Sequence, residues 1–107
     1  MATMKEVVTG LSTVLQNNTA KNKGVNGVFQ FDISGDDPME FFFKLDDGAP
    51  TVGEGTSDSP SITISMASSD FKDMVDGKLN GTMAFMSGKL KIKGDMSLAM
   101  KLESIIK

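Results

Sequence analysis

The chain has 107 residues, a hydrophobic fraction of 39% and a formal net charge of −3, values that are typical of one soluble globular domain. It contains no Cys and no His, which excludes disulfides, the usual zinc sites and His-activated nucleophiles. The acidic balance argues against nucleic acid as a partner. We therefore expect a single domain over residues 1–107 without a cofactor or metal, in which any enzyme chemistry would have to use Ser, Asp, Glu and Lys side chains alone.

The first predicted element is an amphipathic helix near the N-terminus. Thr3 and Glu6 have the spacing of a capping box. Apolar residues then recur at helical spacing from Met4 to Leu15, which predicts a helix of about 13 residues. It ends near Asn18, and its apolar face is expected to pack on a sheet.

Alternation of apolar and polar residues predicts an antiparallel meander after this helix. The strands are expected over residues 28–34, 39–45 and 51–54. In the first strand Phe31 points inward and Gln30 points outward. Phe42 lies on the outer face of the second strand, which indicates that this face is also partly covered.

Two acidic pairs, Asp36-Asp37 and Asp46-Asp47, lie in the turns between these strands. Their spacing does not match a calcium loop, which supplies ligands from alternate positions. We interpret them as solvated turn residues. The glycines near residues 53–55 and 81–89 lack the spacing of dinucleotide and phosphate loops.

The second half of the chain adds more strands and helices. A polar linker precedes a strand over residues 61–66, a helix that begins at residues 68–70 and stops at Gly77, and a short helix over residues 82–87. Leu90 and Ile92 then alternate with lysines in a last strand that ends at Gly94. The whole layout is α+β, with helices against a sheet of about five strands.

A terminal helix begins after Asp95, which has the chemistry of an N-cap. On a helical wheel one apolar arc is expected to face the sheet. It contains Leu98, Ala99, Leu102, Ile105 and Ile106. Met96 and Met100 fall on the flank of this arc, beside Glu103 and Lys107, so the helix has a second apolar edge.

Residues 61–107 resemble the sterol carrier protein 2 family. The resemblance rests on Met66–Phe71, Asp76–Asn80, Ala84–Met96 and Leu98–Leu102, which include the run Gly-Lys-Leu-Lys-Ile-Lys-Gly. Upstream it rests on the strand start Gly27-Val28-Phe29 and on the order of the elements.

The resemblance implies a five-stranded, mostly antiparallel mixed sheet in the order α-β-β-β-β-α-α-β-α, with a crossover before the fourth strand and helices over one face. It also implies an apolar tunnel, with the C-terminal helix as its lid, that admits fatty acids, fatty acyl-CoA, phospholipids or sterols. Peroxisomal members usually end in a tripeptide like Ser-Lys-Leu, whereas this chain ends in Ile105-Ile106-Lys107. We expect an intracellular protein, in the peroxisome or the cytoplasm.

Met is frequent in the segment that would form this tunnel: six of nine Met residues lie between Met66 and Met100. Met fills irregular or changeable apolar surfaces. The candidate ligand-binding residues are Phe71, Met74, Val75, Met83, Phe85, Met86, Leu90, Ile92, Met96 and Met100. For each of them the alternative is an ordinary core position.

The lysines of the last strand, Lys89, Lys91 and Lys93, lie on the side opposite the apolar residues. They are candidates for contact with an anionic membrane or a CoA phosphate, and the alternative is a solvated strand face.

Three functions remain in competition. The first is lipid binding and transfer by a monomer, and the second is an accessory module that presents acyl-CoA to a partner enzyme. A catalytic role is the weakest, because the common general base is missing.

Overall fold

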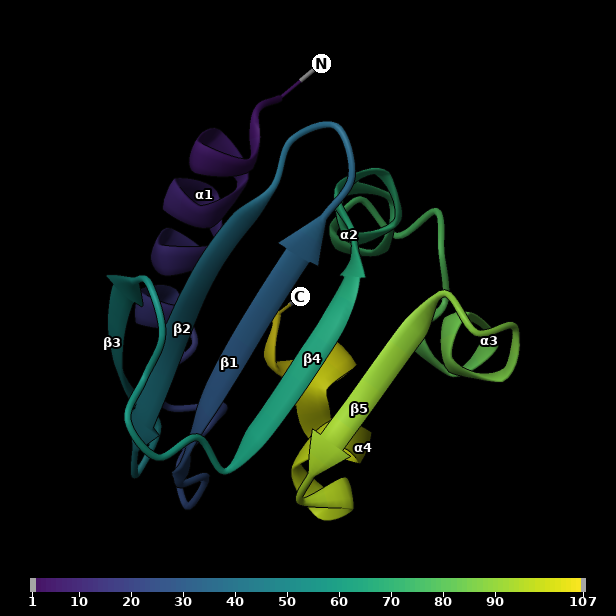
Figure 1. Ribbon diagram of the computed structural model, residues 1–107. Coiled ribbons are helices and arrows are strands. Elements are labelled where there is room, and N and C mark those ends of the chain that lie inside the picture. The colour runs from purple at the N-terminus through teal and green to yellow at the C-terminus, as the bar shows by residue number, and fades with distance from the viewer. Residues whose placement is uncertain (1, 107) are drawn as a thin grey trace.

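The computed structural model describes residues 2–106, so Lys107 lies outside the described residues. Figure 1 shows one twisted sheet with helices behind it. In chain order the elements are α1 (Met4–Asn17), β1 (Gly27–Ser34), β2 (Met39–Asp46), β3 (Ala49–Glu54), β4 (Ile62–Ala67), α2 (Ser68–Val75), α3 (Gly81–Met86), β5 (Leu90–Gly94) and α4 (Met96–Ile105). Among the described residues, no helix has the length and apolar character needed to cross a bilayer.

The sheet has the strand order β3-β2-β1-β4-β5. β1 and β4 are parallel, and the other neighbours are antiparallel. The crossover between β3 and β4 places the fourth strand beside the first. The predicted α+β fold with a five-stranded, mostly antiparallel mixed sheet is thus confirmed.

The core lies between the sheet and the helices, and aromatic rings form its centre. The rings of Phe29 and Phe43 stack with centroids 4.6 Å apart, and those of Phe31 and Phe41 stack at 4.7 Å. Phe71 of α2 meets the second pair edge-on, at 5.5 and 5.8 Å. These cross-strand pairs come directly from the antiparallel register of β1 and β2, because residues opposite each other share a face.

Gln30 is buried and not solvent-facing, which corrects the sequence prediction. It does lie on the side of β1 away from the aromatic core, but the β3–β4 connection covers it there. Its amide nitrogen donates to the Gly55 carbonyl at 3.1 Å, and its Oε1 accepts from the Ser57 N–H at 2.7 Å. The side chain therefore fixes the path of the crossover.

The turn between β2 and β3 is a two-residue hairpin loop made by Asp47 and Gly48. Both have positive φ, 50° and 84°, as expected for a type I′ turn. A Cβ on Gly48 would lie 2.6 Å from the Thr19 carbonyl oxygen, so Gly also permits close packing here. β3 begins at Ala49, two residues earlier than predicted, because Pro50 is compatible with an edge strand.

Asp36, Asp46 and Asp47 are exposed, in agreement with their interpretation, and Asp37 is half-buried. Asp37 and Asp47 also accept hydrogen bonds that the sequence did not indicate. Asp37 Oδ2 accepts from the Met4 N–H at 2.6 Å and from Lys72 Nζ at 3.0 Å. Asp47 Oδ1 accepts from the Gly24 N–H at 2.6 Å. Within residues 2–106 no group of acidic side chains is arranged to hold a metal ion.

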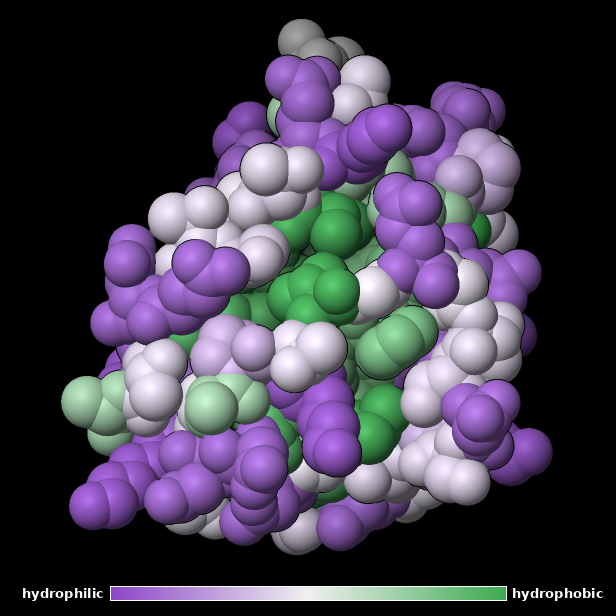
Figure 2. Space-filling model, turned by 90° about the vertical axis from the view of Figure 1, so that its left-hand side faces the viewer, coloured by the Kyte–Doolittle hydropathy of each residue, from purple (hydrophilic) through white to green (hydrophobic). Residues whose placement is uncertain are grey.

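α1 covers the β3 end of the sheet. Its capping box is present, with Thr3 Oγ1 accepting from the Glu6 N–H and Glu6 Oε1 accepting from the Thr3 N–H. Figure 2 shows this side of the molecule, where hydrophobic side chains lie in a hollow between hydrophilic ones. Val7 of α1 and Val52 of β3 are half-buried against the core.

Candidate functional site

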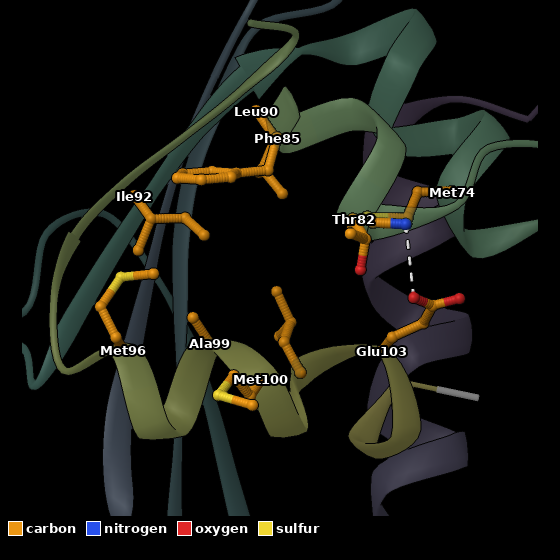
Figure 3. Close-up of a pocket in the computed structure, with 11 residues that line it drawn as sticks. Met74, Thr82, Phe85, Leu90, Ile92, Met96, Ala99, Met100 and Glu103 are labelled. Atoms are coloured by element: carbon orange, nitrogen blue, oxygen red, sulfur yellow. Dashed lines mark hydrogen bonds between the residues drawn. The ribbon is translucent and has the colours of Figure 1, made fainter. Parts of the chain in front are cut away.

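An apolar pocket of about 300 Å³ lies at the opposite end of the sheet, between α3, β5 and α4. Figure 3 shows the open space that its side chains surround. It is lined by Met74, Gly81, Thr82, Phe85, Leu90, Ile92, Met96, Ala99, Met100, Leu102 and Glu103. The Thr82 hydroxyl and the Glu103 carboxylate are the polar side-chain groups of this lining.

β5 supplies one wall of the pocket. It pairs with β4 so that Leu90 lies opposite Met66 and Ile92 opposite Ile64. The strand ends at Gly94, whose φ of 115° is unfavourable for other residues. A Cβ there would come within 2.5 Å of the Ser61 carbonyl oxygen. The tight turn at Gly94 brings α4 back beneath the strand.

α4 supplies the opposite wall, and its N-terminus is fixed by Asp95. The carboxylate accepts from the Ser97 hydroxyl at 2.6 Å and from the Ser97 N–H at 2.9 Å. These hydrogen bonds lower the pKa of Asp95. The predicted apolar arc packs inward: Leu98, Leu102, Ile105 and Ile106 are buried, and Ala99 is half-buried.

The flank of α4 is left open, as the helical wheel indicated. Met96 and Met100 are 49% and 85% exposed, and both line the pocket. Because the buried arc holds the helix against the sheet, these two side chains are free to contact whatever enters the pocket.

α3 forms the third side. Asn80 Oδ1 caps it by accepting from the Thr82 and Met83 N–H groups. Phe85 reaches into the pocket from this helix (Figure 3). At the first residue of α3, the Gly81 N–H donates to Glu103 Oε2 at 3.3 Å. This hydrogen bond joins α4 to the start of α3.

Of the ten candidate ligand-binding residues, six line this pocket. They are Met74, Phe85, Leu90, Ile92, Met96 and Met100. The other four do not. Phe71 belongs to the aromatic core, and Val75 is half-buried against it. Met83 and Met86 lie at the surface of α3, because the buried Ala84 and the pocket-facing Phe85 occupy its inner sides.

The sequence prediction missed Gly81, Thr82, Ala99, Leu102 and Glu103. Ala99 lies three residues after Met96, and Glu103 lies three residues after Met100. The helical wheel therefore placed each of them beside a predicted ligand-binding residue. Leu102 lies on the arc assigned to the core. No local pattern marks Gly81 and Thr82, since they reach the pocket only because α3 folds over α4.

The family model of the SCP-2 sterol transfer family matches residues 11–107. This chain belongs to that family. Membership supports lipid binding and transfer as the class of function. The pocket occupies the part of the chain that carries the strongest resemblance to the family.

Individual relatives agree with this membership. Hydroxysteroid dehydrogenase-like protein 2 of Xenopus tropicalis is 49% identical over 85 residues, which are 78% of this chain and 20% of that protein. The chain thus spans about a fifth of the length of the curated relatives it matches.

Solved structures share the fold. The sterol carrier protein domain 2 of Helicoverpa armigera is 30% identical, with a TM-score of 0.70 over 92% of this chain and 80% of that one. The palmitated SCP2L2 of Aedes aegypti is 24% identical, with a TM-score of 0.69 over 90% of each chain.

Proposed function

We propose that this chain is a non-catalytic domain that binds one lipid and transfers it, with the acyl or sterol part in the pocket between α3, β5 and α4. The observation that carries the proposal is the apolar lining of that pocket at a place where α4 leaves an apolar edge uncovered. Fatty acids, fatty acyl-CoA, phospholipids and sterols all offer the required apolar part.

Hydrophobic transfer alone supplies enough free energy for such binding. Burial of about 15 methylene groups at about 0.8 kcal/mol each gives roughly 12 kcal/mol. The costs of association and ordering remove at least about 4 kcal/mol of this. The remainder of at most about 8 kcal/mol corresponds to a dissociation constant of about 1 μM or weaker, without a charged clamp.

We infer from the size of the pocket that α4 acts as its lid. At about 300 Å³ the volume is at the lower end of the range of about 300–1,000 Å³ for ligand sites. A long chain or a sterol therefore needs α4 or α3 to move outward. A hydrogen bond of 3.3 Å from the Gly81 N–H to Glu103 Oε2 joins the two helices, and such a movement would have to break it.

We infer that fatty acids and acyl-CoA bind with the acyl chain against the apolar lining and the polar head group at the mouth of the pocket. Burial of a head group among apolar side chains without a hydrogen-bond partner would cost free energy.

Titration with a fluorescent fatty-acid probe tests the proposal. We expect saturable, one-to-one enhancement of the probe, which unlabelled fatty acid, acyl-CoA or sterol reverses by competition. Absence of any enhancement with probes of several chain lengths would show that the pocket is not a lipid site.

A second candidate is an accessory module that presents acyl-CoA to a partner enzyme. It is favoured by the relatives, in which the matched segment is a fifth of a longer protein with a dehydrogenase-like name. Native mass spectrometry of the loaded domain separates the two functions. Transfer to acceptor vesicles without any enzyme supports the first, and release only on addition of the enzyme supports the second.

A further inference from the structure

Methionine is the readily oxidised side chain of this protein. The chain has nine Met residues and no Cys, His, Trp or Tyr. A Met thioether is apolar, and a peroxide converts it to a sulfoxide, which is polar and which dedicated reductases return to the thioether. A mild oxidant therefore acts on this protein at its Met sulfurs.

The exposure of the Met residues differs widely along the chain. Met4, Met66 and Met74 are buried in the core, where a peroxide in solution does not reach their sulfurs. Among the described residues, four of the five large hydrophobic side chains that are exposed are Met. They are Met83, Met86, Met96 and Met100. Because oxidation follows exposure, a peroxide should modify these four first and leave the Met residues of the core intact.

Two of the four exposed Met residues belong to the pocket. Met96 and Met100 line it from α4, with exposed fractions of 49% and 85%. Met83 and Met86 lie on α3 and do not line it. The same chemical change at all four positions would therefore alter the pocket lining at Met96 and Met100 only.

A sulfoxide on this edge of the pocket would disfavour a bound lipid. Its oxygen is a hydrogen-bond acceptor that water solvates in the free protein, and contact with an acyl chain removes this water. Burial of such a group without a hydrogen-bond partner costs free energy. Figure 3 shows Thr82 on the side of the pocket opposite Met96, so the Thr82 hydroxyl is not placed to replace that water.

We propose that Met96 and Met100 form an oxidative modification site, with hydrogen peroxide as the oxidant, that controls lipid binding. The inference rests on the proposed function, because it assigns these thioethers to the ligand. A lone pair of the Met sulfur attacks one peroxide oxygen, and the S–O bond forms as the O–O bond breaks. The released hydroxide takes the proton from the transferred oxygen and leaves as water, so the sulfur loses two electrons and the peroxide gains them. The oxidised pocket edge then releases lipid, and reduction of the sulfoxides restores binding.

Treatment of the protein with hydrogen peroxide tests this site, with site-resolved mass spectrometry and titration of a fluorescent fatty-acid probe as readouts. We expect the exposed Met residues to gain oxygen before those of the core. Affinity for the probe should fall at least about tenfold, which corresponds to about 1.4 kcal/mol. Methionine sulfoxide reductases should restore it. Thermal unfolding of the same sample should remain cooperative, because the Met residues of the core stay reduced.

Two double variants separate the pocket from the rest of the exposed Met residues. Met96→Leu, Met100→Leu has apolar side chains that peroxide does not oxidise, so treatment should leave its affinity at its own untreated value. The matched control, Met83→Leu, Met86→Leu, retains the thioethers of the pocket and should lose affinity on oxidation as the wild type does. Equal loss in both variants, or undiminished binding by wild-type protein that is oxidised at Met96 and Met100, would overturn the proposal.

A bound lipid should in turn protect the site. Saturating palmitate should slow the oxidation of Met96 and Met100, which it covers, while Met83 and Met86 react at unchanged rates. Equal rates with and without palmitate at all four positions would also overturn the proposal. Failure of the untreated protein to bind the probe would refute the proposed function and this inference with it, whereas binding that survives oxidation refutes the modification site alone.

Discussion

Asp37 connects three segments that are distant in sequence. Its carboxylate accepts from the first N–H of α1 and forms an ion pair with Lys72 of α2, and its own N–H donates to Ser68 Oγ. The hydrogen bond from Met4 and the nearby Lys72 lower the pKa of this carboxyl. A single residue in the β1–β2 turn thus contacts both α1 and α2, the first through its side chain and the second through its side chain and its backbone N–H.

The lowered pKa of Asp37 determines how its contribution to folding stability depends on pH. Since the folded value lies below the unfolded value of about 3.9, the stabilisation is complete about one pH unit above the unfolded value and is lost as pH falls through the folded pKa. Asp37→Asn should therefore lower the free energy of unfolding at pH 7 and flatten its decline in acid. Urea unfolding across this range measures both effects. Asp36→Asn, at an exposed neighbour, is the control and should change neither.

Leu102 and Met100 lie on one helix but in different surroundings. Leu102 is 3% exposed in the core, so Leu102→Ala should cost about 2–5 kcal/mol of stability. Met100 is largely exposed at the pocket, so Met100→Trp should cost less than the roughly 1–3 kcal/mol of overpacking while affinity for long-chain ligands falls. Thermal unfolding and probe titration measure both. A strongly destabilised Met100→Trp protein, or a stable one with unchanged binding, would refute the assignment of this edge to the ligand.

At the scale of elements, α4 both completes the core and forms a wall of the pocket. Its buried side chains pack against the sheet, and Leu98 lies close to Gly27 at the start of β1. Its C-terminal end is held by Lys21 Nζ, which donates to the Ser104 carbonyl at 2.8 Å. Because α4 also covers the core, its detachment from the sheet would expose the apolar surface beneath it.

Removal of residues 96–107 should therefore abolish ligand retention and expose apolar surface of the sheet. Binding of a hydrophobic dye and the sedimentation coefficient report the exposure, and probe titration reports the retention. A truncated protein that stays monomeric and binds lipid with unchanged affinity would show that α4 is not the lid. The substitution Glu103→Gln is a milder test, and it should weaken the contact with α3 without unfolding the domain.

At the scale of the whole molecule, lipid binding should raise thermal stability. A ligand present at about 100 times its dissociation constant contributes about 2.7 kcal/mol if it binds only the folded state. For a domain of this size that corresponds to a rise in Tm of roughly 10 °C or more. Scanning calorimetry with and without fatty acid checks it, with a short-chain acid of the same charge as control. An unchanged Tm at saturation would mean that the lipid does not bind the folded domain.

The sequence by itself determined the elements and their faces. The capping box, the alternating Phe residues and the Met flank of α4 are local patterns, because side-chain direction in a helix or strand follows from its period. Those patterns, with the resemblance of residues 61–107 to a known family, gave the sheet, the terminal helix and six of the ten candidate residues in the pocket.

The tertiary structure decided which faces meet. Gln30 is polar and alternates with core residues, yet the β3–β4 crossover buries it, and no local pattern marks that connection as a cover. Met83 and Met86 are as apolar as Met96 and Met100, but α3 turns Phe85 inward and leaves them outside. The local period fixes only the relative directions of side chains along an element. The rotation of each helix against the sheet is set by packing between segments distant in sequence, and that rotation separates a pocket wall from an exposed rim.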